Sequence, residues 1–198
     1  MPGGQGALLD LFVAAMLGIG SVLGAAAGIG ALSRAADDDR AGRSELLLAA
    51  PVSRVRQFGE WLALGLVAAA LVDLVAGAVG AACFAAGGQP RFWSTIEAGA
   101  AQIPASVAVV AVAALLSAVL PRASGWLSWT ILVTAVVLGQ FGGVLQIPEW
   151  ARQVSPFSHT PGVPAAHVDW SGAWWLVAVT IAVGMVALVL ARRQDTAR

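Results

Sequence analysis

The sequence predicts an all-α polytopic membrane protein. Hydrophobic residues make up 59% of the 198-residue chain, charged residues make up only 11%, and the mean hydropathy is +0.81. Soluble domains carry about 25% charged residues, and a single domain of this length cannot hide so much apolar surface from water. The spans are expected to be helical, because the edges of an open sheet would leave backbone groups without partners in lipid. The formal net charge of zero gives no reason to expect a nucleic-acid partner.

Five charge-poor stretches are long enough to cross the bilayer, which takes about 20 apolar residues in a helix. We expect them to form a single transmembrane domain over residues 1–198. Pro104 in the third stretch, and Gly139, Gly142 and Gly143 in the fourth, indicate possible kinks or breaks. The expected spans are residues 8–32, 58–88, 98–120, 124–145 and 173–192.

The distribution of arginine predicts how the spans are oriented. Cytoplasmic loops of membrane proteins carry an excess of Lys and Arg. If the charged segment 33–57 is cytoplasmic, nine arginines lie inside and only Arg91 and Arg152 lie outside. The sequence therefore predicts a multi-pass protein of the cell membrane with its N-terminus outside and its C-terminus in the cytoplasm. The nine are Arg34, Arg40, Arg43, Arg54, Arg56, Arg122, Arg192, Arg193 and Arg198.

The charged segment 33–57 is too patterned for a simple connection. Three aspartates at 37–39 suit the start of a helix, where carboxylates meet the positive end of the dipole. Residues 44–50 then read as a short helix that Pro51 ends, and Ser53 is a candidate N-cap for the next helix. A short helix that mixes charges and leucines suits docking in a groove of another protein. The alternative is an ordinary solvated loop that only holds the topology.

Four motifs resemble one family of transporters. Residues 41–54 (AGRSELLLAAPVSR) resemble the coupling-helix region of type-2 ATP-binding-cassette (ABC) exporter permeases. They are particularly similar to the large actinobacterial-type permeases described as exporters of polyketide antibiotics such as tetronasin. The similarity continues at residues 120–125 (LPRASG), 147–150 (IPEW) and 155–159 (SPFSH), in family order over most of the chain.

The resemblance implies a permease subunit that exports hydrophobic or amphipathic small molecules. A separate cytoplasmic ABC ATPase would hydrolyse ATP, and a second permease half or another copy of the chain would complete the path. The ATPase would rest against the coupling helix. By resemblance, the contacts would come from Arg40, Arg43, Glu45, Leu47 and Arg54.

The resemblance also implies that a span is missing. A complete half in this family has six spans and begins in the cytoplasm, whereas five spans that begin outside are expected here. The first expected span corresponds to the family's second. Three explanations stay open: the C-terminal part of a longer permease, a split subunit, or a misannotated start.

Asp73 is the only charged residue expected deep inside a span. A charge at the centre of the bilayer costs roughly 2.5–3.5 kcal/mol, so such residues usually face the interior of a helix bundle. One interpretation is a polar group on the substrate path. The other is a helix-contact residue, either neutral or hydrogen-bonded to a neighbour such as Gln140.

Gly20, Gly24 and Gly28 repeat every four residues and therefore share one face of the first span. Small residues on one face let two helix backbones approach closely. The sequence therefore predicts a helix-packing stripe. Its partner is either the second permease half or one of the chain's own spans.

The outer segment 146–172 is expected to begin with an amphipathic helix in the membrane interface. Pro148 suits its first turn, and Glu149 and Arg152 would lie on the polar face. The apolar face would carry Ile147, Trp150, Ala151 and Val154.

The sequence contains no motif for catalysis, metal or cofactor binding. His159, His167 and Asp169 do not have the spacing of a compact metal site. The chain lacks a P-loop, a G-x-S-x-G elbow and an H-E-x-x-H pair. We therefore expect a transport subunit that is not itself an enzyme. Two rival interpretations stay open: a secondary transporter fragment driven by an ion gradient, and a structural membrane subunit that transports nothing.

Overall fold

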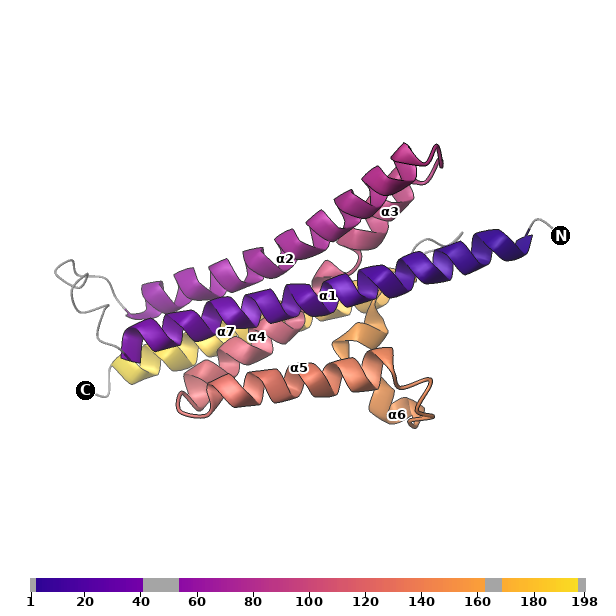
Figure 1. The fold of residues 1–198 in the computed structure, drawn as a ribbon. Coiled ribbons are helices and arrows are strands. Elements are labelled where there is room, and N and C mark those ends of the chain that lie inside the picture. Colours follow the sequence, from indigo (N-terminus) through magenta and orange to yellow (C-terminus); the bar gives the residue numbers. More distant parts are fainter. Residues whose placement is uncertain (1–2, 41–53, 163–168, 196–198) are drawn as a thin grey trace.

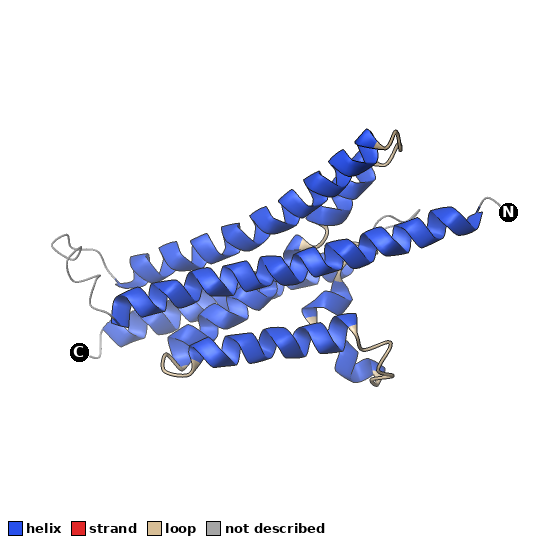
Figure 2. Ribbon diagram, viewed as in Figure 1, coloured by secondary structure: helices blue, strands red, loops and turns tan. Residues whose placement is uncertain are grey.

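The computed structural model describes residues 3–40, 54–162 and 169–195, and these residues form helices and connections without any strand (Figure 2). This confirms the predicted all-α fold class. The elements are α1 (Gly3–Arg40), α2 (Arg54–Ala86), α3 (Phe92–Ala100), α4 (Ile103–Val119), α5 (Ser124–Gln140), α6 (Glu149–Arg152), the 3₁₀-helix η1 (Pro156–His159) and α7 (Ser171–Asp195).

Four helical stretches in the described part of the chain are long and apolar enough to cross a membrane: Leu8–Arg34, Val55–Ala86, Phe92–Val119 and Ser171–Arg193. The apolar helix α5 has 17 residues. At 1.5 Å per residue it reaches about 25 Å, a little less than the hydrocarbon core of about 30 Å. A fifth crossing by α5 therefore stays a prediction.

The third stretch is broken in two. α3 ends at Ala100, and α4 begins at Ile103 with Pro104 in its first turn. Proline lacks a backbone N–H, so it is tolerated in the first turn and disfavoured further along a helix. The expected third span therefore begins earlier than predicted, at Phe92, and changes direction before Pro104.

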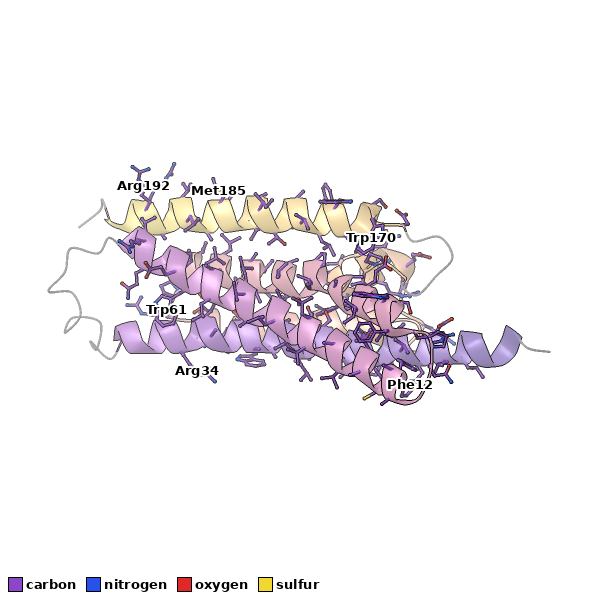
Figure 3. The ribbon with its side chains drawn as sticks, turned by 90° about the horizontal axis from the view of Figure 1, so that it is seen from above. Phe12, Arg34, Trp61, Trp170, Met185 and Arg192 are labelled. Atoms are coloured by element: carbon purple, nitrogen blue, oxygen red, sulfur yellow. The ribbon has the colours of Figure 1, made fainter. Side chains whose placement is uncertain are left out.

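Helix α4 is the centre of the bundle. It contacts α1, α2, α5, α7 and η1, and its buried positions are mostly alanines and valines such as Ala105, Val110 and Ala114. Small side chains allow several helices to approach one axis closely. Helices α1 and α7 lie on opposite sides of the bundle (Figure 3). The outer faces carry exposed Leu, Ile and Val side chains, as expected of surfaces that meet lipid.

The two ends of the bundle differ in charge. The C-terminal ends of α1 and α7, the start of α2 and the turn between α4 and α5 lie together at one end (Figure 1). We call this end the basic end, and Figure 3 shows Arg34 and Arg192 there, with Phe12 and Trp170 toward the opposite end. The arginines of its described helices and turns are Arg34, Arg40, Arg54, Arg56, Arg122, Arg192 and Arg193.

Two local predictions are wrong. Residues 37–39 belong to the last turns of α1, so the three aspartates do not begin a helix. Helix α1 continues this far because residues 33–36 contain no Gly or Pro to stop it. The interfacial helix is also shorter than predicted, since α6 has only four residues. Arg152, predicted on its polar face, instead packs over Gly142, where an added Cβ would lie 2.7 Å from Arg152 Cγ.

Candidate functional site

The glycine stripe of α1 packs against helices of the same chain. Gly20, Gly24 and Gly28 are all buried. A Cβ added at Gly24 would lie 2.9 Å from the carbonyl oxygen of Ala69 on α2. One at Gly28 would lie 2.7 Å from the carbonyl oxygen of Gly65 and 2.4 Å from Val110 Cγ2. These distances leave no room for a side chain. The stripe was expected to pack either against a second permease half or against the chain's own spans. In this structure it packs against the chain's own helices α2 and α4.

Asp73 lies at the centre of this packing. Its side chain is 1% exposed, and the Ser106 hydroxyl on α4 lies 2.6 Å from Asp73 Oδ2, within hydrogen-bond distance. Asp73 Oδ1 has no hydrogen-bond partner among the described residues and lies 3.0 Å from the position of an added Cβ at Gly24. Ser21, one turn before Gly24 on α1, is also fully buried and its hydroxyl is likewise unpartnered in the described part. We call the hydrogen-bonded pair of Asp73 and Ser106 the polar crossing.

Gln140 is not the partner of Asp73. It is the last residue of α5 and lies against Gly18, where an added Cβ would be 2.7 Å from Gln140 Nε2. Gly18 precedes Gly24 by six residues, which is about 9 Å along α1. The amide therefore contacts α1 nearer the end opposite the basic end. Gln140 was one example of a neighbour that could hydrogen-bond Asp73, and the structure places Ser106 of α4 in that position.

A second close contact holds α2 from the other side. Gly77 on α2 faces Gly99 on α3, and a Cβ added at Gly99 would lie 2.7 Å from the Cα of Gly77. The same Cβ would lie 3.1 Å from the carbonyl oxygen of Asp73. Helix α2 is thus packed at backbone distance against both α1 and α3. Asp73 and Ser106 are both buried in this conformation.

The residues predicted to contact an ATPase lie at or beyond the described helix ends. Arg40 is the last residue of α1 and Arg54 is the first residue of α2, both at the basic end (Figure 1). Arg43, Glu45 and Leu47 fall in the part of the chain that the structure does not describe, as does the predicted short helix 44–50.

The opposite end is closed by a compact cap that the sequence did not reveal. The buried hydroxyl of Ser155 donates to the carbonyl oxygen of Ala135 on α5 at 2.7 Å and accepts from the Phe157 amide. An added Cβ at Gly139 would lie 2.6 Å from Ser155 Oγ. The close fit at Gly139 therefore explains the glycine there, because any side chain would displace Ser155.

An ion pair and a helix cap complete this end. Arg91, just before α3, pairs with Asp10 on α1. The Asp169 carboxylate accepts from the Ser171 amide at 2.9 Å at the start of α7, and this hydrogen bond lowers the pKa of Asp169. His159 Nδ1 lies 3.1 Å from the carbonyl oxygen of Ser155. Within the described residues, no three His, Cys, Asp or Glu side chains gather where they could hold a metal ion.

Known proteins resemble this chain over nearly all of its length. The sequence model of the family described as "Multidrug efflux system permease Rv1217c, C-terminal domain" matches residues 1–192. The chain is also similar to the multidrug efflux system permease protein Rv1217c of Mycobacterium tuberculosis (strain ATCC 25618 / H37Rv), with 27% identity over 98% of this chain. That match covers 36% of the relative, so the chain spans about a third of the length of this curated relative.

Proposed function

Because the chain belongs to the family of the multidrug efflux permease C-terminal domain, we propose that it is the membrane-spanning permease subunit of an ABC exporter. A separate ATPase hydrolyses ATP, and the permease exports hydrophobic or amphipathic small molecules. The family match over residues 1–192 is the observation that carries this proposal. Residues 41–54 resemble a coupling helix, and this resemblance is the reason for proposing an ATPase partner that docks on this segment.

The packing of α1 on α2 supports a mechanical role for the segment between them. Residues 41–53 join the end of α1 to the start of α2 at the basic end. Along the glycine stripe the two helices touch at backbone distance, so a force applied to their joined ends moves them as a pair. An ATPase drives this motion only if its ATP-bound form binds one conformation of the permease more tightly than the other.

The cargo is proposed from resemblance. The relative is named for multidrug efflux, and the motifs resemble permeases described as exporters of polyketide antibiotics. Both point to apolar or amphipathic molecules that partition into the membrane. The proposal includes a second permease half or another copy of this chain, which would supply the other wall of the path.

Co-purification with an ATPase tests the proposal. We expect a cytoplasmic ABC ATPase encoded beside this chain to co-purify with it from membranes, and Glu45→Arg or Arg43→Glu to release that ATPase. Membrane insertion should stay unchanged. Glu149→Arg is the matched control, because Glu149 lies on α6 at the opposite end of the bundle. The proposal fails if no ATPase accompanies the wild-type chain or a longer protein that contains it.

Thiol labelling tests the proposed orientation, in which the basic end is cytoplasmic. Cys83 is the only cysteine, so Cys83→Ser provides a background for single-cysteine variants. Arg40→Cys and Arg54→Cys should react with a membrane-impermeant reagent only after the membrane is opened. Labelling of either variant in intact cells would place the basic end outside, where no ATPase could reach it.

Transport energetics separate this proposal from its rivals. An ABC exporter loses transport when cellular ATP is depleted at constant ion gradients. A secondary transporter loses transport when the gradients are collapsed at constant ATP. A structural subunit shows no transport in either condition when it is reconstituted with its partners.

A further inference from the structure

We propose that Asp73 is a proton-binding residue, which carries its proton while the polar crossing is packed and releases it only when α2 parts from α4. The protonation state is argued from the hydrogen-bond geometry and does not depend on what the permease carries. The release step rests on the proposed function, because it assumes that the helices move during transport.

The single hydrogen of the Ser106 hydroxyl favours a protonated Asp73. The Ser106 hydroxyl lies 2.6 Å from Asp73 Oδ2 and 3.0 Å from the carbonyl oxygen of Ile103. Both distances are those of hydrogen bonds, yet a serine hydroxyl has one hydrogen to donate. A carboxylate cannot donate, so an ionised Asp73 would have to share the one Ser106 hydrogen with the Ile103 carbonyl oxygen in a weaker three-centre bond. A protonated Asp73 satisfies both, since its own O–H donates to Ser106 Oγ and Ser106 donates to Ile103.

The other carboxyl oxygen of Asp73 also bears on its protonation state. Asp73 Oδ1 is buried and has no hydrogen-bond partner within the described part of the chain. In a protonated carboxyl group this atom is a neutral carbonyl oxygen, whereas in a carboxylate it shares the negative charge. Burying an unpaired charge costs far more than burying an unpaired neutral acceptor. The geometry around Oδ1 therefore favours the protonated form.

The helices that pack around Asp73 carry no compensating charge near it among their described residues. Residues 11–32 of α1 and the whole of α4 contain no charged side chain. On α3 the one ionisable residue is the acidic Glu97, which is exposed and is not a cation. On α2 the nearest charged residue along the sequence is Glu60, more than three turns away. No cation among the described residues of these helices faces Asp73 to stabilise its ionised form.

The consequence is a link between packing and proton binding. When α2 moves away from α4, water reaches Asp73 and hydrates its carboxylate, so the proton leaves to bulk water. Closing the crossing again requires a proton to return, because an ionised Asp73 would be sealed among apolar side chains. Each opening and closing of the crossing therefore releases and takes up one proton per chain.

Infrared spectroscopy of the full chain in lipid nanodiscs tests the proposal, because a protonated carboxyl group has a C=O stretching band that a carboxylate lacks. At neutral pH we expect one such band in the wild-type protein, which shifts when aspartate carboxyl carbons are labelled with ¹³C. The band should be lost in Asp73→Asn. Asp10→Asn is the matched control and should retain it, because the Asp10 side chain pairs with Arg91 outside the polar crossing.

A second variant keeps the test decisive if Asp73→Asn fails to fold. Ser106→Ala keeps the carboxyl group and removes the acceptor of its proton, so the band should persist and move to higher frequency. Three results would each overturn the proposal: no protonated-carboxyl band in the wild type at neutral pH, an unchanged band in Asp73→Asn, or an unshifted band in Ser106→Ala.

Discussion

Adding a single methyl group at Gly28 should destabilise the bundle. A Cβ there would lie 2.4 Å from Val110 Cγ2 and 2.7 Å from the carbonyl oxygen of Gly65, whereas ordinary contacts begin at 3.4 Å. The backbone of α2 would have to move away by roughly 0.7 Å, because a carbonyl oxygen cannot rotate aside as a long side chain can. Overpacking of this kind costs typically about 1–3 kcal/mol.

Gly30 on the same helix provides the matched control. A Cβ added at Gly30 meets nothing within 4 Å, so Gly30→Ala keeps the general gain of about 1 kcal/mol in helix propensity without any clash. The propensity gain is common to both variants and cancels in their difference. We therefore expect Gly28→Ala to be less stable than Gly30→Ala by about 1–3 kcal/mol in reversible unfolding from mixed detergent micelles, monitored by circular dichroism. Equal stability of the two variants would refute the packing of α1 against α2 and α4.

Three further predictions concern the end opposite the basic end. Ser155→Ala should lower the free energy of unfolding by about 1 kcal/mol in the same assay, because it removes the hydrogen bond to Ala135. Ser158→Ala, at a neighbouring exposed position, should lower it by less than about 0.5 kcal/mol. Asp10→Asn should cost no more than about 1 kcal/mol, and a double-mutant cycle with Arg91→Gln should show a coupling that weakens with added salt, because both side chains are partly exposed. The hydrogen bond from Ser171 lowers the pKa of Asp169. The stabilisation of α7 by this carboxylate is therefore present above the unfolded-state pKa and is lost as pH falls through the folded-state pKa. Protection of the Ser171 amide from hydrogen exchange should fall on acidification in the wild type and change little with pH in Asp169→Asn.

The apolar spans and the asymmetry of charge could be predicted because each depends on composition along one segment. Long charge-free stretches determine which residues enter lipid, and arginines accumulate where a segment leaves it. The glycine stripe could be predicted equally well, since four-residue spacing places three glycines on one helix face whatever that face contacts. Which helix it meets depends on contacts between distant segments, and the sequence left that choice open.

The partner of Asp73 could not be predicted, because it depends on how α4 is rotated and how far it is shifted along the bundle. Both are set by the break between α3 and α4, which the sequence treated as part of one continuous span from residue 98. Polar residues were available at Ser106 on α4 and Gln140 on α5, and the packing brings Ser106 to Asp73 and Gln140 to Gly18. Pro104 indicated a possible break. It did not predict where the break would place Ser106 relative to Asp73, because that position depends on α3 being a separate helix.

The short α6 and its cap have a similar origin. The alternation of apolar and polar residues around Trp150 predicted a longer amphipathic helix, since periodicity reports only which residues share a face. The chain instead turns back over α5, where Gly139 and Gly142 leave space for Ser155 and Arg152. Glycines at the end of one helix can thus determine where the next segment packs, and a reading of each segment alone misses this.

The contacts made by α2 differ in kind on its different sides, and this difference decides which contacts are expected to open. Against α1 and α3 it packs at backbone distance through glycines, so even a small separation loses dispersion contacts along several turns. Toward α4 it meets side chains, since a Cβ added at Gly65 would lie 3.2 Å from Val110 Cγ1. It is also tied to α4 by a hydrogen bond to one carboxyl group, which water can replace once the carboxyl group is hydrated. A force applied to the joined ends of α1 and α2 should therefore keep these two helices together and part them from α4 at the polar crossing. Asp73 then lies at the surface that opens, where a removable proton lets the same side chain be buried in one conformation and hydrated in the other.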